Sequence, residues 1–175
     1  MRKKLKVLKS VIELENPWFK VIMENVINPI NKYQYEYHTL VKNKAIFIIP
    51  LENNNIYLIK QYRHSIKKNV LELPAGGMKN DHERPIDCAR RELKEETGFE
   101  ARDMTKIGHF YMAPGHSSQE AEVYLATHLK KSERLLEQTE IISKMERVSL
   151  FKLKRLLSNN QVLSGPTLSS LCLFL

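Results

Sequence analysis

Residues 77–99 read GMKNDHERPIDCARRELKEETGF and contain the clearest helix signal in the chain. Pro85 suits the first turn of a helix, where its missing N–H costs no hydrogen bond, and apolar residues follow it at helical spacing as far as Leu93. Gly98 readily adopts the left-handed conformation that ends helices. The stretch therefore predicts a helix that begins at Pro85 and ends at Gly98.

Three carboxylates share one face of this predicted helix. Glu92, Glu95 and Glu96 stand at positions i, i+3 and i+4, where like charges destabilise a helix unless a cation compensates them. A solvated acidic face would show the same spacing. However, Glu83 lies just before the helix, and the turn at residues 74–77 can direct a backbone carbonyl to the same space. Because oxygen-only ligands suit Mg²⁺ and not zinc, we predict a Mg²⁺ site, with Mn²⁺ as the alternative.

The sequence around the helix predicts an α/β fold. Runs of apolar and β-branched residues predict strands at 45–51, 56–63, 70–73, 104–112, 122–129 and 144–150. Ser149 is expected to cap a short helix, and a final helix is expected from Ser164, with Leu168, Leu171, Cys172 and Leu175 on one face. This order predicts a mixed β-sheet sandwiched between α-helices.

The N-terminal part of the chain differs from the rest. Apolar and aromatic runs predict strands at 5–14, 19–27 and 33–41, separated by polar turns. We expect residues 1–43 to form an antiparallel β-region that contributes to a dimer, and residues 44–175 to form the main domain.

Composition limits the classes of protein to which the chain can belong. Its 175 residues, 42% of them hydrophobic, are typical of a globular protein and exclude disordered and fibrous classes. No apolar run is long enough to cross a membrane, and residues 1–10 lack the apolar core of a signal peptide. Two cysteines are too few for a disulfide framework, so both are expected to pack as small hydrophobes in a cytoplasmic protein.

The net charge of +8 serves solubility or attracts phosphate-bearing ligands. Nucleic acid is not an expected partner, because the basic residues are not interleaved with aromatic residues that could stack on bases.

The spacing Gly77-x5-Glu83-x7-Arg91-Glu92-Leu93-x-Glu95-Glu96-x-Gly98-Phe99 resembles the Nudix box at every specified position. Gln61-Tyr62-Arg63, residues 71–76 and Ala113-Pro114-Gly115 resemble the ADP-ribose pyrophosphatase branch of that family. The resemblance implies the Nudix fold and a homodimer with an exchanged N-terminal β-region. It also implies Mg²⁺-dependent hydrolysis of a nucleoside diphosphate sugar, with ADP-ribose, AMP and ribose 5-phosphate as the expected substrate and products.

The resemblance also assigns roles within the box. Glu92 and Glu96 would bind Mg²⁺, Glu95 would assist, Glu83 would support the site, and Arg91 would orient these carboxylates. The glycine after Pro-Ala is doubled here, so the metal-binding carbonyl is that of Ala75 or of Gly76.

Outside the box, the resemblance implies residues that bind substrate. Arg63 is expected to clamp a phosphate, since a guanidinium binds phosphate oxygens in a bidentate manner. Pro114 lies 15 residues after Phe99, at a spacing associated with ADP-ribose in the family. Gln119 stands where the family commonly has a glutamate, and Glu120 follows it.

The sequence leaves several choices open. Glu137, Glu140 or a glutamate of the box could be the general base, and neither the number of metals nor the attacked phosphorus follows from the residues. GDP-mannose, another nucleotide sugar or a dinucleotide is the alternative substrate, and an RNA-cap or housecleaning pyrophosphohydrolase is a second enzymatic reading. A non-catalytic nucleotide-binding Nudix regulator is the alternative of another class, but the intact box disfavours it.

Overall fold

The computed structural model describes residues 4–80, 82–134, 141–162 and 164–175. The chain divides into two compact units. One unit comprises Met1–Asn43 and Tyr111–Glu120, and the other comprises Lys44–Phe110 and Ala121–Leu175.

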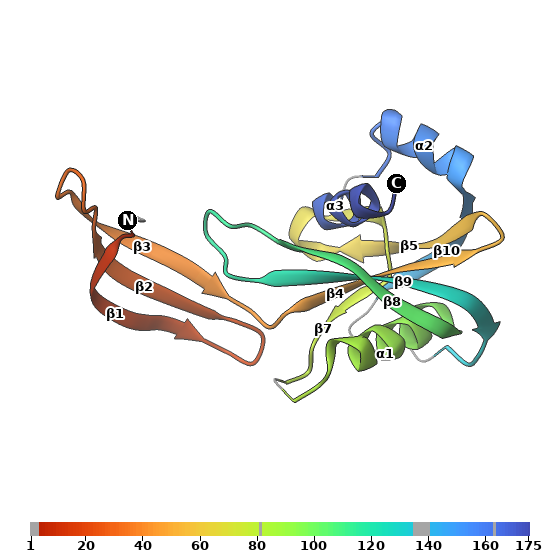
Figure 1. The fold of residues 1–175 in the computed structure, drawn as a ribbon, viewed down its shortest axis with the longest axis horizontal. Coiled ribbons are helices and arrows are strands. Elements are labelled where there is room, and N and C mark those ends of the chain that lie inside the picture. Colours follow the sequence, from red (N-terminus) through yellow and green to blue (C-terminus); the bar gives the residue numbers. More distant parts are fainter. Residues whose placement is uncertain (1–3, 81, 135–140, 163) are drawn as a thin grey trace. The chain divides into compact units, whose positions relative to one another are not determined.

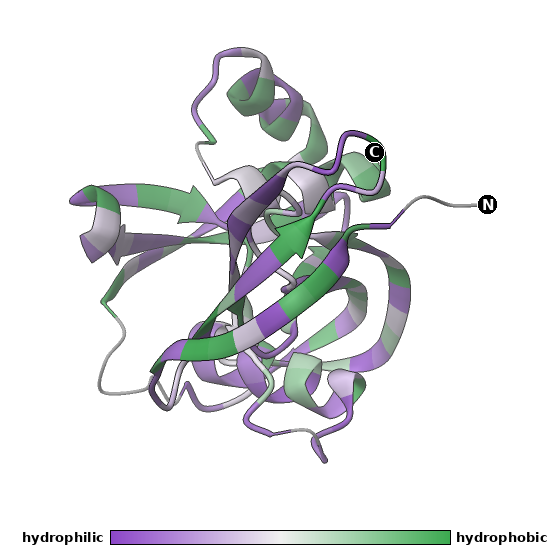
Figure 2. Cartoon of the chain, turned by 90° about the vertical axis from the view of Figure 1, so that its left-hand side faces the viewer, coloured by the Kyte–Doolittle hydropathy of each residue, from purple (hydrophilic) through white to green (hydrophobic). Residues whose placement is uncertain are grey.

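The first unit contains a three-stranded antiparallel sheet of β1 (Lys6–Glu15), β2 (Lys20–Ile27) and β3 (Gln34–Val41), in that spatial order (Figure 1). The predicted antiparallel N-terminal β-region is therefore confirmed. Hydrophobic and hydrophilic residues are mixed along these strands (Figure 2). Every residue of β1 is exposed, so the apolar side chains of this strand are not covered within the described chain.

The second unit is built on a mixed sheet with the order β10-β5-β4-β9-β8. β4 (Ala45–Glu52) pairs in parallel with β9 (Glu120–Lys131), whereas β5 (Asn55–Arg63) pairs antiparallel with β4 and with β10 (Ile142–Ser149). The remaining strands are β6 (Lys68–Glu72), which pairs with β5, β7 (Ala75–Gly77), which pairs with β4, and β8 (Phe99–Tyr111).

Helices cover both faces of this sheet. α1 (Pro85–Thr97) lies on one face and α3 (Gly165–Phe174) on the other, while α2 (Leu150–Ser158) follows β10 (Figure 1). Apolar residues of α1 pack against residues of β4, β5, β8 and β9 in a buried cluster. The predicted mixed sheet between helices is therefore confirmed. No helix of the described ranges combines the length and the apolar composition needed to cross a membrane.

Helix α1 forms as the local signals predict. Pro85 occupies its first turn, and Gly98 follows it with a φ of 70°, a left-handed conformation that glycine adopts without strain. β8 then starts at Phe99, five residues before the predicted start of that strand.

The predicted face of the last helix is only partly the buried one, because Leu171 is buried and Leu168 half-buried. Thr167, Ser170 and Leu171 are its buried residues, whereas Cys172 and Leu175 are exposed. The apolar residues of α3 surround its axis, so their spacing does not select one face. A tertiary contact helps to select it instead, because Thr167 Oγ1 accepts a hydrogen bond from Leu73 N at 3.1 Å. The packing role predicted for the cysteines therefore holds for the buried Cys88 and fails for Cys172.

Candidate active site

Two glutamates of α1 are buried on the side of the helix that faces β7. Glu92 is 6% exposed and Glu96 is 1% exposed. Burial of a carboxylate costs free energy unless hydrogen bonds or cations compensate it. Ala75 N supplies one such contact, because it donates a hydrogen bond to Glu96 Oε2 at 2.8 Å.

Glu92 lies directly over the backbone of Gly76. A Cβ atom at Gly76 would stand 2.0 Å from Glu92 Oε1 and 2.1 Å from its Cδ, far inside van der Waals contact. The missing side chain at Gly76 therefore makes the space that the Glu92 carboxylate occupies. Together with the bond from Ala75, this contact places both buried carboxylates against β7.

Arg91 binds the carboxylates around it. Its Nη1 donates to Glu92 Oε1 at 2.6 Å and to Glu95 Oε2 at 2.9 Å, and its Nε donates to Glu83 Oε1 at 3.0 Å. Burial lowers the pKa of the Arg91 guanidinium, but its carboxylate partners outweigh burial and raise the pKa above its usual value. Arg91 is therefore a fixed positive charge among these glutamates.

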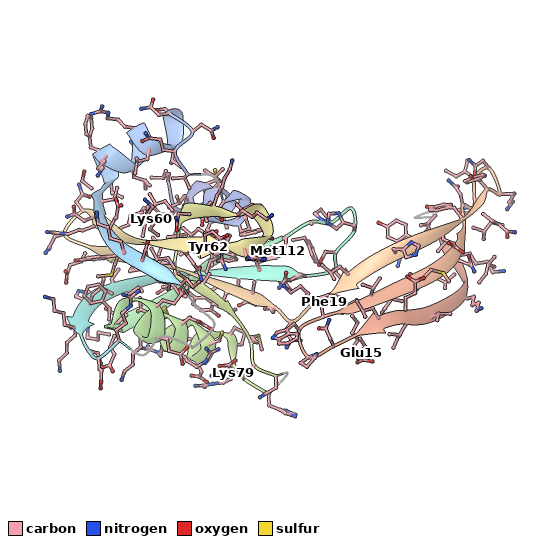
Figure 3. The ribbon with its side chains drawn as sticks, turned by 180° about the vertical axis from the view of Figure 1, so that it is seen from behind. Glu15, Phe19, Lys60, Tyr62, Lys79 and Met112 are labelled. Carbon is pink, nitrogen blue, oxygen red and sulfur yellow. The ribbon has the colours of Figure 1, made fainter. Side chains whose placement is uncertain are left out.

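The loop before α1 brings Glu83 into this cluster. Lys79, labelled in Figure 3, donates its backbone N–H to Glu83 Oε2 at 2.6 Å. Burial raises the pKa of Glu83, but the hydrogen bonds from Arg91 and Lys79 outweigh burial and hold the pKa below its usual value. Glu83 therefore stays ionised at neutral pH.

The donor set fits a divalent cation that prefers oxygen. Four carboxylates, those of Glu83, Glu92, Glu95 and Glu96, gather near Arg91, and the charge of Lys79 also acts on Glu83. Among the residues that the structure describes, no three acidic, His or Cys side chains are grouped as metal ligands, and Arg91 lies between several of the carboxylates. The match to a divalent cation therefore rests on the oxygen ligands that the cluster offers and not on a preformed coordination geometry.

Arg63 lies at the end of β5 and binds a residue that the sequence did not single out. Its Nε donates a hydrogen bond to Glu72 Oε2 at 2.7 Å, and its Nη2 forms an ion pair with the same oxygen at 2.7 Å. The Glu72 side chain is 10% exposed and the Arg63 side chain 41% exposed. The one available signal was a charged residue between two leucines, Leu71 and Leu73, in a short strand.

Gln61 is a second polar residue to which the sequence assigned no role of its own. It is buried on β5, and its Oε1 has no hydrogen-bond partner among the described residues. Gln61 and Arg63 are two positions apart on the strand, so their side chains share one face of the sheet. Tyr62, labelled in Figure 3, stands between them in the sequence.

The residues predicted to contact substrate near Pro114 belong to the other unit. Pro114 is exposed, whereas Gln119 and Glu120 are half-buried. Gln119 Nε2 donates to Asn43 O at 2.8 Å, and Tyr37 donates its hydroxyl to the backbone carbonyl of the adjacent Gly115 at 2.7 Å. These bonds tie the loop to β3 and its end, and the substrate role of the three residues stays a prediction.

Glu137 and Glu140, the two loop candidates for the general base, lie outside the described residues. The described backbone resumes at Ile141, whose carbonyl accepts a hydrogen bond from Tyr62 N at 3.1 Å. Ile141 itself therefore lies beside β5 at Tyr62, one residue before Arg63.

Comparison with known proteins identifies a matching family and several relatives of this chain. The pattern of the NUDIX domain matches residues 41–166. The ADP-ribose pyrophosphatase of Bacillus subtilis (strain 168) is 34% identical over 118 residues, which cover 66% of this chain and 63% of that protein. The ADP-ribose pyrophosphatase of Mycobacterium tuberculosis (strain ATCC 25618 / H37Rv) is 39% identical over 88 residues, which cover 50% of this chain and 42% of that protein. The match thus spans less than two thirds of either relative.

A solved structure, described as the crystal structure of ADP compounds hydrolase, superposes with a TM-score of 0.87. The superposition covers 98% of this chain and 92% of the other, at 24% sequence identity. This likeness shows that the two chains share a fold.

Proposed function

The chain belongs to the NUDIX domain family, and from that membership we propose that it hydrolyses the pyrophosphate bond of a nucleoside diphosphate sugar. ADP-ribose is the proposed substrate, and AMP and ribose 5-phosphate are the proposed products. The observation that carries the proposal is the pair of buried carboxylates, Glu92 and Glu96, held against β7 on the helix of the intact box. The names of the two ADP-ribose pyrophosphatases support the choice of substrate.

We propose Mg²⁺ as the cofactor, with Mn²⁺ as the alternative. Glu92, Glu96 and the carbonyl of Ala75 or Gly76 would hold it, with Glu95 and Glu83 in support. A divalent cation at this position neutralises the charge of a diphosphate and lowers the pKa of an attacking water.

The protein groups of the site position the reactants. Arg91 holds Glu83, Glu92 and Glu95 in fixed orientations through hydrogen bonds to all three carboxylates. Arg63 is proposed to bind the diphosphate, because its side chain is partly exposed while its Nε and Nη2 contact Glu72. Pro114, Gln119 and Glu120 are proposed to contact the rest of the substrate. Glu137, Glu140 or a box glutamate is proposed as the general base.

Turnover of a panel of nucleotides tests this proposal. We expect ADP-ribose to yield AMP and ribose 5-phosphate when Mg²⁺ is present, and no product when the metal is removed with a chelator. The protein is incubated separately with ADP-ribose, GDP-mannose, NADH and a nucleoside triphosphate, with and without Mg²⁺. Chromatography of the products then measures both substrate selectivity and metal dependence. Turnover of GDP-mannose alone would replace the substrate, whereas nucleotide binding without any Mg²⁺-dependent cleavage would favour a regulator.

We also propose that residues 1–43 form a dimerising region and that residues 44–175 carry the hydrolase domain, in a cytoplasmic protein. In the described chain β1 pairs only with β2, so its outer edge is unpaired, and the strand exposes apolar residues. An unpaired, apolar edge strand favours association with another chain, here by exchange of the β-region between two copies.

A charge on β1 is expected to break this dimer. Ile12 is 52% exposed, and Ile12→Lys would place an ammonium group in the proposed interface. We expect sedimentation velocity to show a dimer for the wild type and a monomer for this variant. Ile30→Lys is the matched control, since Ile30 is exposed in the turn between β2 and β3. A wild-type monomer at micromolar concentration would contradict the proposal.

A further inference from the structure

Arg63 reaches Glu72 diagonally across two paired strands. β5 and β6 are antiparallel, with Arg63 opposite Lys68 and Ile59 opposite Glu72. At about 3.3 Å per residue, the backbones of Arg63 and Glu72 are roughly 13 Å apart along the strands. Because residues opposite each other lie on the same face, the Arg63 side chain must extend back over Gln61 to meet Glu72.

The charges around Arg63 favour this extended position. Lys68, directly opposite, carries a like charge, and like charges at this position of a strand pair repel each other. Glu72, the acceptor at the other end, is buried and therefore held by its surroundings. The guanidinium is thus drawn away from Lys68, towards the end of β6 that leads into β7.

Glu72 contacts one edge of the guanidinium. The hydrogen bond from Nε and the ion-pair contact of Nη2 both end on the same oxygen, Oε2. A guanidinium has five N–H donors in a rigid plane, so fixing the Nε and Nη2 edge also fixes the direction of the Nη1 group. The Arg63 side chain is 41% exposed and Glu72 contacts its Nε and Nη2, so Nη1 is the group that we expect to bind an anion from solvent.

The backbone joins this pair directly to the acidic cluster. Glu72 precedes Ala75 by three residues, and Ala75 N binds Glu96 at 2.8 Å. One short segment therefore connects the residue that orients Arg63 with the strand against which the buried carboxylates lie.

We propose that Glu72 is a positioning residue, which orients Arg63 so that its Nη1 edge receives a phosphate of the diphosphate. This inference rests on the proposed function for the identity of the ligand. Glu72 itself touches no phosphate, because a carboxylate repels it; it acts through Arg63.

The test combines kinetics with binding of a diphosphate that is not cleaved. We would measure KM and kcat for ADP-ribose, and affinity for methylenediphosphonate by calorimetry, both with Mg²⁺. We expect Arg63 to bind the diphosphate equally well in the ground state and in the transition state. Loss of its orientation should therefore raise KM and leave kcat nearly unchanged. We expect Glu72→Gln to raise KM about tenfold and to weaken diphosphonate binding about tenfold, because one charge-assisted contact is lost.

Two further variants separate positioning from stability. In an Arg63→Gln background, Glu72→Gln is expected to add almost nothing to KM, because residues that act as a unit are not additive. Arg63→Lys is expected to weaken diphosphonate binding nearly as much as Arg63→Gln, since an ammonium lacks the rigid fork. This second variant keeps the proposal testable if Glu72→Gln does not fold, because Arg63 is partly exposed.

The control is Glu100→Gln, which removes a carboxylate from an exposed pair with Lys94. It should leave KM and binding unchanged. Wild-type KM and diphosphonate affinity in Glu72→Gln, full additivity with Arg63→Gln, or wild-type affinity in Arg63→Lys would each overturn the proposal. If the wild type binds diphosphonate through Arg63 but cleaves no nucleotide sugar, the proposed function fails, and the binding data alone decide the role of Glu72. A wild type that neither cleaves nor binds contradicts both.

Discussion

Replacement of Glu96 by Gln is expected to lower kcat about 10³-fold or more while the protein stays folded. Glu96 is almost fully buried against β7, where its charge counts most because water does not screen it. An uncharged amide is a much weaker ligand for Mg²⁺ than a carboxylate, and loss of one preorganised electrostatic group commonly costs about 10²–10³ in kcat. The Gln Oε1 can still accept the hydrogen bond from Ala75 N, so the fold should persist.

Three measurements check this expectation. Steady-state kinetics gives kcat, calorimetric titration with Mg²⁺ gives the affinity for the metal, and thermal unfolding reports the fold. The matched control is Glu100→Gln, an exposed glutamate just beyond α1. Full turnover or unchanged Mg²⁺ affinity in the Glu96 variant would refute the proposed metal role of Glu96.

Gly76→Ala is expected to lower kcat/KM about 10²-fold through a single methyl group. The new Cβ would overlap the Glu92 carboxylate at 2.0 Å, so this carboxylate would have to move and would lose its 2.6 Å bond from Arg91. Displacement of a catalytic group by about 1 Å can cost about 10² in rate. Backbone strain does not contribute, because the φ of Gly76 is outside the left-handed region.

Gly77→Ala provides a closely matched control for this substitution. It adds the same methyl group one residue later, where no heavy atom lies within 4 Å of the new Cβ, and most of the activity should remain. Parallel kinetics and thermal unfolding of both variants separate a local effect from a general one. Equal activity in the two variants would mean that the space over Gly76 does not matter for turnover.

The box helix could be predicted because its signals are local. Pro85 at its start, Gly98 at its end and the apolar spacing between them act within a few residues, and α1 has the predicted bounds. Burial of Glu92 and Glu96 is a tertiary property, yet their spacing already placed them on one face.

The contact between Arg63 and Glu72 could not be predicted, because it depends on the register of β5 and β6. Glu72 precedes the glycine-rich segment in the sequence, and only the pairing of two strands shows that Arg63 can reach it. The same reason applies to the loop after Met112. Its attachment to β3, through Tyr37 and Gly115, joins residues that are 78 positions apart.

The last helix shows where periodicity fails. Its apolar residues surround the axis, and the hydrogen bond between Leu73 and Thr167 is one of the contacts that select the buried side. Apolar residues that are spread around a helix carry no directional signal, so the orientation of the helix follows from partners elsewhere in the chain.

The origin of the oxygen in the products tests the central proposal most directly. We would incubate the protein with ADP-ribose and Mg²⁺ in H₂¹⁸O and analyse the products by mass spectrometry, with Glu96→Gln in parallel. We expect AMP and ribose 5-phosphate in equal amounts, one ¹⁸O atom per turnover in the phosphate of one of them, and almost no product from the variant. Intact ADP-ribose with the wild type, release of adenine, or equal turnover by Glu96→Gln would contradict hydrolysis of the pyrophosphate bond at the buried carboxylates.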